Sequence, residues 1–404
     1  MFQLLYKKSQ WICDRALSFT QKLVQTPSQS LIEEEVARLV ENEMKKIGFE
    51  KIVPDDAGNV TGIILGRKMS PTVLLNCHMD TAHVLDEDKW SDAPYSGTIK
   101  DGRLFGLGAS DCKAGLAAQL FAAEILKNSL LPFDGNLIFS ATVCEEDGGS
   151  IGVKKLMDET LPMFHLKPDI AILGEPTSLG VYYGHDGWME AEIRVEGGNP
   201  FQVQDAANEI FSDFDRNYNN NTDKMHIFPP RFDNNKGMTC AVIDIARRFG
   251  ESEEPGTILN NLKHEAMLIA EGTGCVAVET CLKTEKKSCY TGKATVIKHI
   301  VNAWTTDPFN AYLSRACQAL KAGGEEVMTG KWKLGRLGMG TAGAVFLNDY
   351  QIPVIGYGPG SEDAAHAVNE YVEIKNIERA IYGTAVMVHG IIGTPVFGWT
   401  MDEI

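Results

Sequence analysis

The sequence lacks any C-x-x-C pair, although it contains nine cysteines. An odd number of cysteines without that spacing is a poor basis for a disulfide framework, and it predicts a reducing, cytoplasmic location. The sequence also lacks a stretch approaching the roughly 20 apolar residues that a transmembrane helix needs, and its first residues do not have the pattern of a signal peptide. We therefore expect a cytoplasmic protein that has no membrane partner.

Positive charge is in short supply. The chain has 38 Lys and Arg against 54 Asp and Glu, which gives a formal net charge of -16. This balance argues against nucleic acid and against anionic membrane surfaces as partners. Internal repeats are also absent. The chain is long: it has 404 residues, of which 44% are hydrophobic. This is more than one ordinary hydrophobic core accommodates, so the length predicts two domains.

Five segments combine metal-binding side chains with an apolar strand or a glycine turn. They read VLLNCHMDTAHV, GLGASDCKAGLAA, ATVCEEDGGSIG, AILGEPTS and GPGSEDAAHAVNE, and they carry His78, Asp80, Asp111, Glu145, Glu146, Glu175 and His366. Two histidines and five carboxylates are the usual composition of a paired zinc site with a general base beside it. One such segment alone is more often an ordinary strand end, a solvated pair or a helix cap. Five in order predict a metal centre.

Apolar runs alternate with helical patterns in the first half of the chain. Strands are expected at 59–66, 72–80, 136–144 and 169–173, and helices at 30–48, with Ser30 as the cap and Glu33 at capping-box spacing, and at 111–127. This rhythm predicts an α/β fold with a mostly parallel sheet and helices on both faces. Ligands gather at the carboxyl ends of strands in such sheets, and four of the candidate residues follow strand ends.

The pattern changes after Gly184 and returns near Ala303. We expect a catalytic domain made of residues 1–184 and 303–404, with a small α+β lid domain inserted at 185–302. In the lid, a helix is expected at 204–217 and strands at WMEAEIRVEG, 240–247 and 266–270. The chain then resumes with helices at 308–322 and 374–388 around the strand IPVIGYG.

The spacing of the candidate residues suggests their roles. His78 and Asp80 share a face of a strand, so the Asp80 carboxylate can orient the imidazole. Asp111 opens a helix, and its two oxygens can bridge two cations that lie ~3.5–4 Å apart. Glu145 and Glu146 are adjacent and point differently, so one can bind metal while the other takes a proton.

Three cysteines, Cys77, Cys112 and Cys144, lie beside these candidates. They could be zinc ligands. We instead expect them to be small apolar residues on buried strands, because a strand alternates faces and each cysteine neighbours a residue that must point the other way. Cys112 lies in a turn, where that alternation does not apply. Six further histidines have no ligand spacing and are expected to be structural: His83, His165, His185, His264, His299 and His389.

Taken together, these motifs resemble the M20 family of metallopeptidases and deacylases, on the branch of acetylornithine deacetylase and succinyl-diaminopimelate desuccinylase. The resemblance spans nearly the whole chain, including an inserted lid. It implies one zinc at His78, Glu175 and Asp111 and a second at His366, Glu146 and Asp111. It also implies that Glu145 is the general base and that Asp80 supports His78.

The lid, and one turn of the catalytic domain, depart from the family's pattern. Its histidine is missing from VEGGNPFQVQDAANEI, the arginine of an Asp-x-Arg strand is missing from MLIAEGTG, and the aspartate of a GGTD turn is missing from GMGTAG. Arg336 and Thr341 are the remaining candidates for gripping a substrate carboxylate, and Asn199 and His226 for stabilising an oxyanion. The resemblance also implies a homodimer through the lid, and MEAEIRVEG is expected to serve as the pairing edge.

These features predict an amide hydrolase with two divalent ions per chain, zinc by expectation, with cobalt or manganese as alternatives. A zinc-bound water would attack the carbonyl of a small N-acyl amino acid or short peptide. Two alternatives stay open, which are a dipeptidase or carboxypeptidase of the same family and a catalytically weakened relative that binds metal and a ligand.

Overall fold

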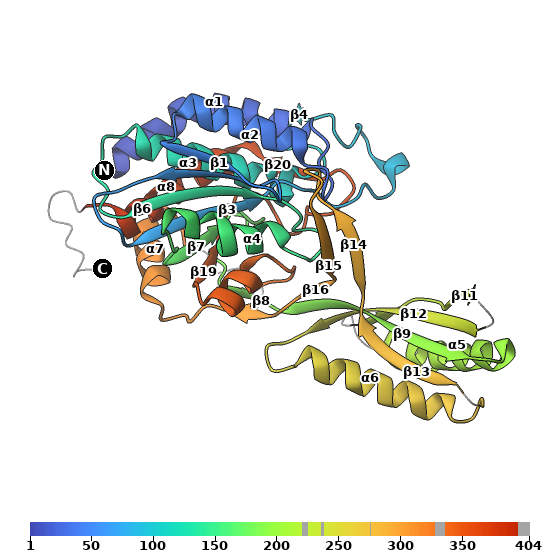
Figure 1. Cartoon of the computed structure of the whole chain (residues 1–404). Helices are drawn as coiled ribbons and strands as arrows, with labels where there is room; N and C mark the ends of the chain where they lie inside the picture. The colour runs from blue at the N-terminus through green and yellow to red at the C-terminus, as the bar shows by residue number, and fades with distance from the viewer. Residues whose placement is uncertain (220–224, 236–237, 275, 328–335, 395–404) are drawn as a thin grey trace. The chain divides into compact units, whose positions relative to one another are not determined.

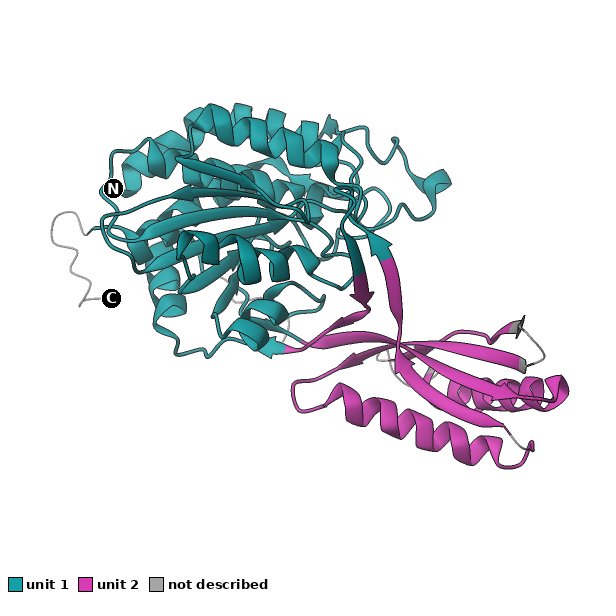
Figure 2. Ribbon diagram, viewed as in Figure 1, with its two compact units in different colours: residues 1–185, 287–295, 304–404 teal, residues 186–286, 296–303 magenta. Residues whose placement is uncertain are grey.

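The computed structural model describes residues 1–219, 225–235, 238–274, 276–327 and 336–394. The chain divides into two compact units (Figure 2), a larger one of residues 1–185, 287–295 and 304–404 and a smaller one of residues 186–286 and 296–303. Two junctions, 185/186 and 303/304, each lie one residue from the expected boundaries of the inserted domain. Residues 287–295, which were expected within the insertion, belong to the larger unit.

A six-stranded sheet forms the centre of the larger unit (Figure 1). Its strands, in spatial order, are β1 (Lys51–Pro54), β2 (Val60–Ile64), β6 (Asn136–Thr142), β3 (Thr72–His78), β7 (Ile170–Leu173) and β19 (Val354–Gly356). The last four run parallel, and β1 and β2 pair antiparallel. Every residue of β3 and β6 is buried, which explains why their sequences are nearly continuous apolar runs.

Helices cover both faces of this sheet. They are α1 (Phe2–Val24), α2 (Glu34–Ile47), α3 (Ala114–Lys127), α4 (Ile151–Lys155), α7 (Ala311–Ala322) and α8 (Ile374–Ile392). The connection β3–α3–β6 runs one way along the strand order and β6–α4–β7 runs the other way. Since such crossovers are right-handed, α3 and α4 lie on opposite faces. The predicted α/β class, with a mostly parallel sheet, is confirmed.

Short elements complete the larger unit. They are a three-stranded sheet of β4 (Thr98–Lys100), β5 (Arg103–Phe105) and β20 (Tyr371–Glu373), another of β8 (Gly184–His185), β17 (Trp304–Thr305) and β18 (Arg336–Leu337), and helical turns at Glu87–Lys89, Ala109–Lys113, Leu156–Thr160, Pro162–Phe164 and Val345–Asp349. A two-stranded sheet, β14 (Thr284–Ser288) with β15 (Ala294–Lys298), contains the other two points where the chain passes between the units, 286/287 and 295/296.

The start of α2 differs from the sequence prediction. The helix begins at Glu34, and Ser30 does not cap it. The Ser30 hydroxyl instead donates to Asp80 Oδ2 at 2.7 Å, and the Glu33 carboxylate accepts the N–H groups of Leu31 and Cys144. The capping-box spacing is therefore used for contacts between distant segments, which local pattern reasoning could not anticipate.

The smaller unit is a sheet covered by two helices. Its strands are β9 (Gly187–Gly197), β10 (Met225–Ile227), β11 (Arg231–Asn235), β12 (Met238–Phe249), β13 (Ala277–Leu282) and β16 (Ile300–Val301), and its helices are α5 (Pro200–Phe214) and α6 (Pro255–Ala270). A turn at Asp215–Asn219 follows α5. Residues of β9 alternate between buried and partly exposed, and the buried ones join α5 and α6 in one apolar core. This is the expected α+β class.

Two predictions for this unit are wrong. Residues 266–270 are the end of α6, because the apolar run MLIA continues the helical spacing from Ile258 and Leu262. The preceding strand is β12, and it carries Asp244, Arg247 and Arg248. The segment MEAEIRVEG is also no pairing edge, because β9 is paired by β12 on one side and by β13 on the other.

The eight cysteines among the described residues are free. Across the same residues, every helix is too short or too polar to cross a membrane.

Candidate metal centre

Two groups of metal-type ligand atoms converge past the ends of the parallel strands. One group is His78, Asp111, Cys112 and Glu175, the other is Asp111, Glu146 and His366, and within each group all ligand atoms lie within 4.8 Å of one another. Asp111 belongs to both groups, with Oδ1 3.1 Å from His78 Nε2 and Oδ2 3.2 Å from His366 Nε2. Glu146 Oε2 lies 2.9 Å from the same His366 nitrogen. The structure thus brings the five predicted ligands together.

The fold explains this convergence. His78 is the last residue of β3, Glu146 follows β6, and Glu175 follows β7. These three strands are neighbours and parallel, so their carboxyl ends meet at one edge of the sheet. Asp111 lies in the irregular turn before α3, and His366 in the loop between β19 and β20.

The imidazole of His78 is oriented by backbone rather than by a carboxylate. Its Nδ1 lies 2.9 Å from the carbonyl oxygen of Asp80, and the nearest Asp80 carboxylate oxygen is 3.6 Å away. A carbonyl only accepts, so Nδ1 carries the proton and Nε2 is free to bind a cation. The expected orienting role of Asp80 is present, but its main-chain oxygen provides the hydrogen bond.

The Asp80 carboxylate has a different task. It accepts the N–H of Glu145 at 2.9 Å and the N–H of Glu146 at 3.0 Å, together with the Ser30 hydroxyl. Asp80 is fully buried, so these bonds act in a dry environment where they are strong. Asp80 therefore holds the turn that presents both adjacent glutamates.

Glu145 lies beside the ligand groups without belonging to either. Burial raises its pKa well above the usual range of a carboxyl, and the negative charges of Glu175 and Glu146 add to this effect while His78 opposes it. A cation bound nearby would lower this pKa again. A carboxylate in such a position can take up a proton and release it.

The charges of the centre fit two divalent cations. Burial raises the pKa of Glu175 to about 8 and raises that of Glu146. Burial disfavours the charged form of His366, but its contacts with Asp111 and Glu146 outweigh this and raise its pKa to about 11. Glu146 Oε1 is buried without a hydrogen-bond partner among the described residues. The buried carboxylates are stabilised in their charged form by positive charge nearby. The histidine nitrogens and carboxylate oxygens of the two groups are donors that suit two bound metal ions.

Sequence reasoning missed two buried residues behind Asp111. The Glu370 carboxylate accepts the N–H groups of Gly108, Ser110 and Asp111 at 3.0, 2.7 and 3.0 Å. Lys113, also fully buried, donates to the carbonyl of Thr26 at 2.8 Å, and burial lowers its pKa to about 7. Both lie close in sequence to a predicted ligand. The one signal in the sequence was a charged residue next to an apolar run, and that pattern does not distinguish a buried charge from an exposed one.

Two of the proposed substrate-gripping residues, Arg336 and Thr341, belong to the larger unit. Arg336 is in β18, and its side chain lies outside what the structure describes. Thr341 is buried, its N–H donates to His185 Nε2 at 2.8 Å, and its hydroxyl accepts the N–H of Gly343. His185 also packs edge-on against Trp304 and so holds this loop, as its expected structural role requires.

The two proposed oxyanion donors belong to the smaller unit. Asn199 is the N-cap of α5 and accepts the N–H of Phe201 at 3.0 Å. His226 is an exposed residue of β10. A role for either of them, or for Arg336 and Thr341, in binding substrate stays a prediction.

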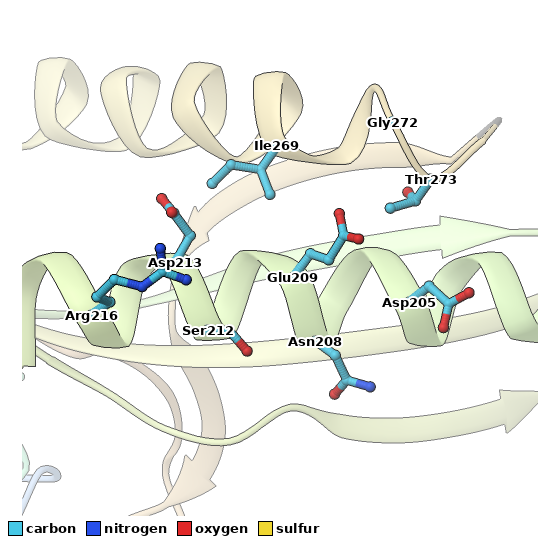
Figure 3. Close-up of a pocket in the computed structure, with 9 residues that line it drawn as sticks. All are labelled: Asp205, Asn208, Glu209, Ser212, Asp213, Arg216, Ile269, Gly272 and Thr273. Atoms are coloured by element: carbon cyan, nitrogen blue, oxygen red, sulfur yellow. The ribbon is translucent and has the colours of Figure 1, made fainter.

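A pocket between α5 and α6 of the smaller unit has a volume of about 610 Å³ (Figure 3). Asp205, Glu209 and Asp213 follow one another at single-turn spacing along α5, with Arg216 at the end of the row. Among the residues that the structure describes, the lining of this pocket has no histidine or cysteine, and its carboxylates belong to neither ligand group. We assign no chemistry to it.

Comparison with known proteins places these observations in context. A family model described as peptidase family M20/M25/M40 matches residues 74–389. An uncharacterized protein of Escherichia coli K12, YgeY, is 26% identical over 91% of this chain and 92% of its own length.

Solved structures agree with the fold. Dug1p of Saccharomyces cerevisiae, described as a dipeptidase, superposes with a TM-score of 0.74 at 15% identity over 96% of this chain and 98% of its own. YXEP of Bacillus subtilis, described as a dinuclear metal-binding peptidase, superposes with a TM-score of 0.67 at 15% identity over 95% of this chain and 100% of its own.

Proposed function

The chain belongs to peptidase family M20/M25/M40, and from this premise we propose that it is a metal-dependent amide hydrolase. Its substrate would be a small N-acyl amino acid, from which it removes the acyl group, or a short peptide. The observation that carries the proposal is Glu145, a partly buried carboxylate beside two ligand groups that share Asp111. Metal storage or a structural metal site would have no use for such a residue.

The residues that would hold the metal are those of the two groups, with Asp111 shared between them. When bound, two divalent ions would polarise the substrate carbonyl and lower the pKa of the attacking water. Zinc fits the mixture of imidazole and carboxylate donors, and cobalt or manganese would also be accepted.

The protein's own part is proton transfer and positioning. The Glu145 carboxylate takes a proton from the attacking water and later gives it to the nitrogen of the departing amine. Asp80 keeps Glu145 in place through the Glu145 N–H, and it keeps His78 in the correct tautomer through its carbonyl. The amide bond is thereby hydrolysed to a carboxylate and an amine.

Two alternative functions motivate the choice of substrates. A dipeptidase is supported by the description of Dug1p. A weakened metal- and ligand-binding relative is supported by the absence of the lid's usual histidine and of an aspartate in GMGTAG. A panel of N-acetyl amino acids, N-succinyl amino acids and dipeptides, assayed with added zinc, cobalt or manganese, separates deacylase from peptidase. No turnover on any of them would favour the weakened relative.

The paired variants Glu145→Gln and Glu146→Gln test the mechanism. We expect Glu145→Gln to keep both metals and lower turnover by roughly 10²–10⁴-fold, since it removes a general base. Glu146→Gln should instead weaken metal binding, because it removes a ligand. Metal content and turnover of both variants are to be measured together. If the two phenotypes were exchanged, the roles of the adjacent glutamates would be reversed.

We also propose a homodimer through the smaller unit. Since β9 is an interior strand, we place the pairing at β13, which among the described residues pairs on one side only, with β9. The opposite edge of the sheet is formed by β10 and β11, which in the same part of the chain pair only with β12. An exposed edge presents unpaired N–H and C=O groups that another strand can use. Light scattering should give twice the chain mass, and Thr280→Pro in β13 should shift the protein to monomer. A monomeric wild type would refute the proposal.

A further inference from the structure

The Cys112 sulfur lies beside the predicted metal ligands, although the sequence predicted a purely apolar role for this residue. Its Sγ is one of the four ligand atoms, with those of His78, Asp111 and Glu175, that all lie within 4.8 Å of one another. Cys112 is fully buried. The second group, around His366 and Glu146, contains no sulfur. The two halves of the centre therefore differ in their donor atoms.

The arrangement is close to that of a bound ion. Zinc bonds of about 2.0–2.3 Å in a tetrahedral site place neighbouring ligand atoms about 3.3–3.8 Å apart. The distance from His78 Nε2 to Asp111 Oδ1, 3.1 Å, is near that value, and the other separations reach at most 4.8 Å. Side-chain rotations of ordinary size bring all four atoms onto one ion.

The other contacts of this thiol are weak and do not compete with metal binding. Cys112 Sγ lies 3.6 Å from the carbonyl oxygen of His78 and also makes a side-chain hydrogen bond with the Cys77 thiol, and a thiol is a weak donor. Cys77 provides the comparison, because it is an equally buried thiol on the neighbouring strand that donates to Gln119 Oε1 at 3.4 Å. Cys77 belongs to neither ligand group, although it precedes His78 directly in sequence.

We propose that Cys112 is a fourth protein ligand of the ion held by His78, Asp111 and Glu175. This inference rests on the proposed metal centre and adds to it. On binding, the thiol releases its proton to solvent and the thiolate sulfur bonds the ion, with no change of oxidation state. The ion has four protein ligands, and the ion at His366 has three.

The two ions are then chemically unequal. Sulfur favours zinc, cobalt or cadmium over manganese and magnesium, so the Cys112 half selects the softer ions. The His366 half has only nitrogen and oxygen donors and accepts harder ions. Four protein ligands close a site, whereas three leave a position open. The open position for substrate therefore belongs to the His366 half.

Cobalt spectroscopy tests the inference directly. The metal-free full chain is titrated with Co²⁺, and the near-ultraviolet region is examined for a sulfur-to-cobalt charge-transfer band. The variants are Cys112→Ser, Cys112→Ala and the matched control Cys77→Ser. We expect the band in wild type and in Cys77→Ser and its loss in both Cys112 variants. A Cd²⁺ titration should show the tighter site weakened by at least about tenfold in Cys112→Ser.

Each outcome decides the matter. Two bound cobalt ions per wild-type chain without the band would overturn the role of Cys112 and leave the metal centre standing. A band that persists in the Cys112 variants, or that disappears in Cys77→Ser, would also overturn it. Failure of wild type to bind any cobalt would overturn both this inference and the proposed function. If one Cys112 variant fails to fold, the other is measured in its place, and a wild type that binds cobalt without the band overturns the proposal in any case.

Discussion

At the scale of the single residue, the Glu370 carboxylate accepts hydrogen bonds from three backbone N–H groups. They belong to the segment that carries Asp111, the predicted ligand common to both groups. The acceptors are Oε1 for Ser110 and Asp111 and Oε2 for Gly108. Its own backbone carbonyl accepts the N–H of Gly106. A segment held by so many bonds keeps the Asp111 carboxylate in place when the metal is absent.

Substitution of Glu370 should therefore affect metal binding without touching a metal ligand. Glu370→Gln turns one acceptor into a donor facing the Gly108 N–H, so we expect metal affinity to fall by about 10–100-fold, the usual cost of a lost outer partner. Calorimetric titration with zinc measures this. Glu373→Gln, three residues on and paired with Arg103, is the control. Unchanged zinc affinity in Glu370→Gln would show that the turn is held without it.

The residue scale also shows the limits of motif reading. The five predicted metal ligands and Glu145 could be singled out as candidates because each stands beside a strand end or glycine turn. Ser30, Glu370 and Lys113 were not, because their partners lie 50, 259 to 262 and 87 residues away in sequence. A buried charged residue in an isolated sequence looks like an exposed one. Burial is a property of the folded chain.

At the scale of the element, α8 shows how one buried titratable side chain makes the stability of the folded protein depend on pH. Its residues from Ala380 to Ile392 are all buried. His389 is among them. Its ring lies against Phe133, and neither ring nitrogen has a hydrogen-bond partner within the described part of the chain. Burial lowers the pKa of His389 to about 4, below the ordinary value near 6.5.

The consequence is a loss of stability on acidification. Between pH 6.5 and pH 4 the unfolded chain protonates this histidine and the folded chain does not, so stability is complete above about pH 6.5 and falls as pH drops towards 4. We expect His389→Leu to remove this part of the pH dependence, on the order of 3 kcal/mol across the window. Urea unfolding at several pH values measures it. Parallel curves for variant and wild type would contradict the prediction.

A helix or strand was predicted correctly where the residues close to it in sequence are enough to decide its structure. The strands β3, β6 and β7 were located because a strand buried on both faces is a short apolar run. Residues 266–270 were assigned to a strand because five apolar residues in a row look alike in a strand and in a buried helix turn. The interior place of β9 could not be read locally, since an alternating pattern is the same at an edge and in the middle of a sheet.

At the scale of the whole molecule, the proposed metal ions would join segments far apart in sequence. The ligands come from positions 78 to 366, and the chain between them includes the entire smaller unit. Ions that bind the folded chain and not the unfolded one stabilise it by mass action, about 4 kcal/mol when free metal is 1,000 times its dissociation constant.

Metal removal should accordingly lower the melting temperature of the larger unit by several degrees, and added zinc should restore it. Differential scanning calorimetry with and without a chelator measures the shift. Asp111→Ala, which lacks the shared ligand, should melt at the same temperature under both conditions. A shift of equal size in that variant would mean that the chelator acts elsewhere.

The sequence by itself determined the α/β class, because that class depends on periodicity. It also predicted an inserted domain, and from side-chain types next to strand ends it predicted a set of candidate metal ligands, while the choice of Glu145 as the base came from the family resemblance. Only the tertiary structure decided which partners those residues have. It places the Asp80 carboxylate where it accepts hydrogen bonds from the backbone N–H groups of Glu145 and Glu146. It also places the Cys112 sulfur beside the predicted metal ligands. The physical reason is that hydrogen bonds and coordination depend on distances in space, and these are set by strand order and burial across the whole chain.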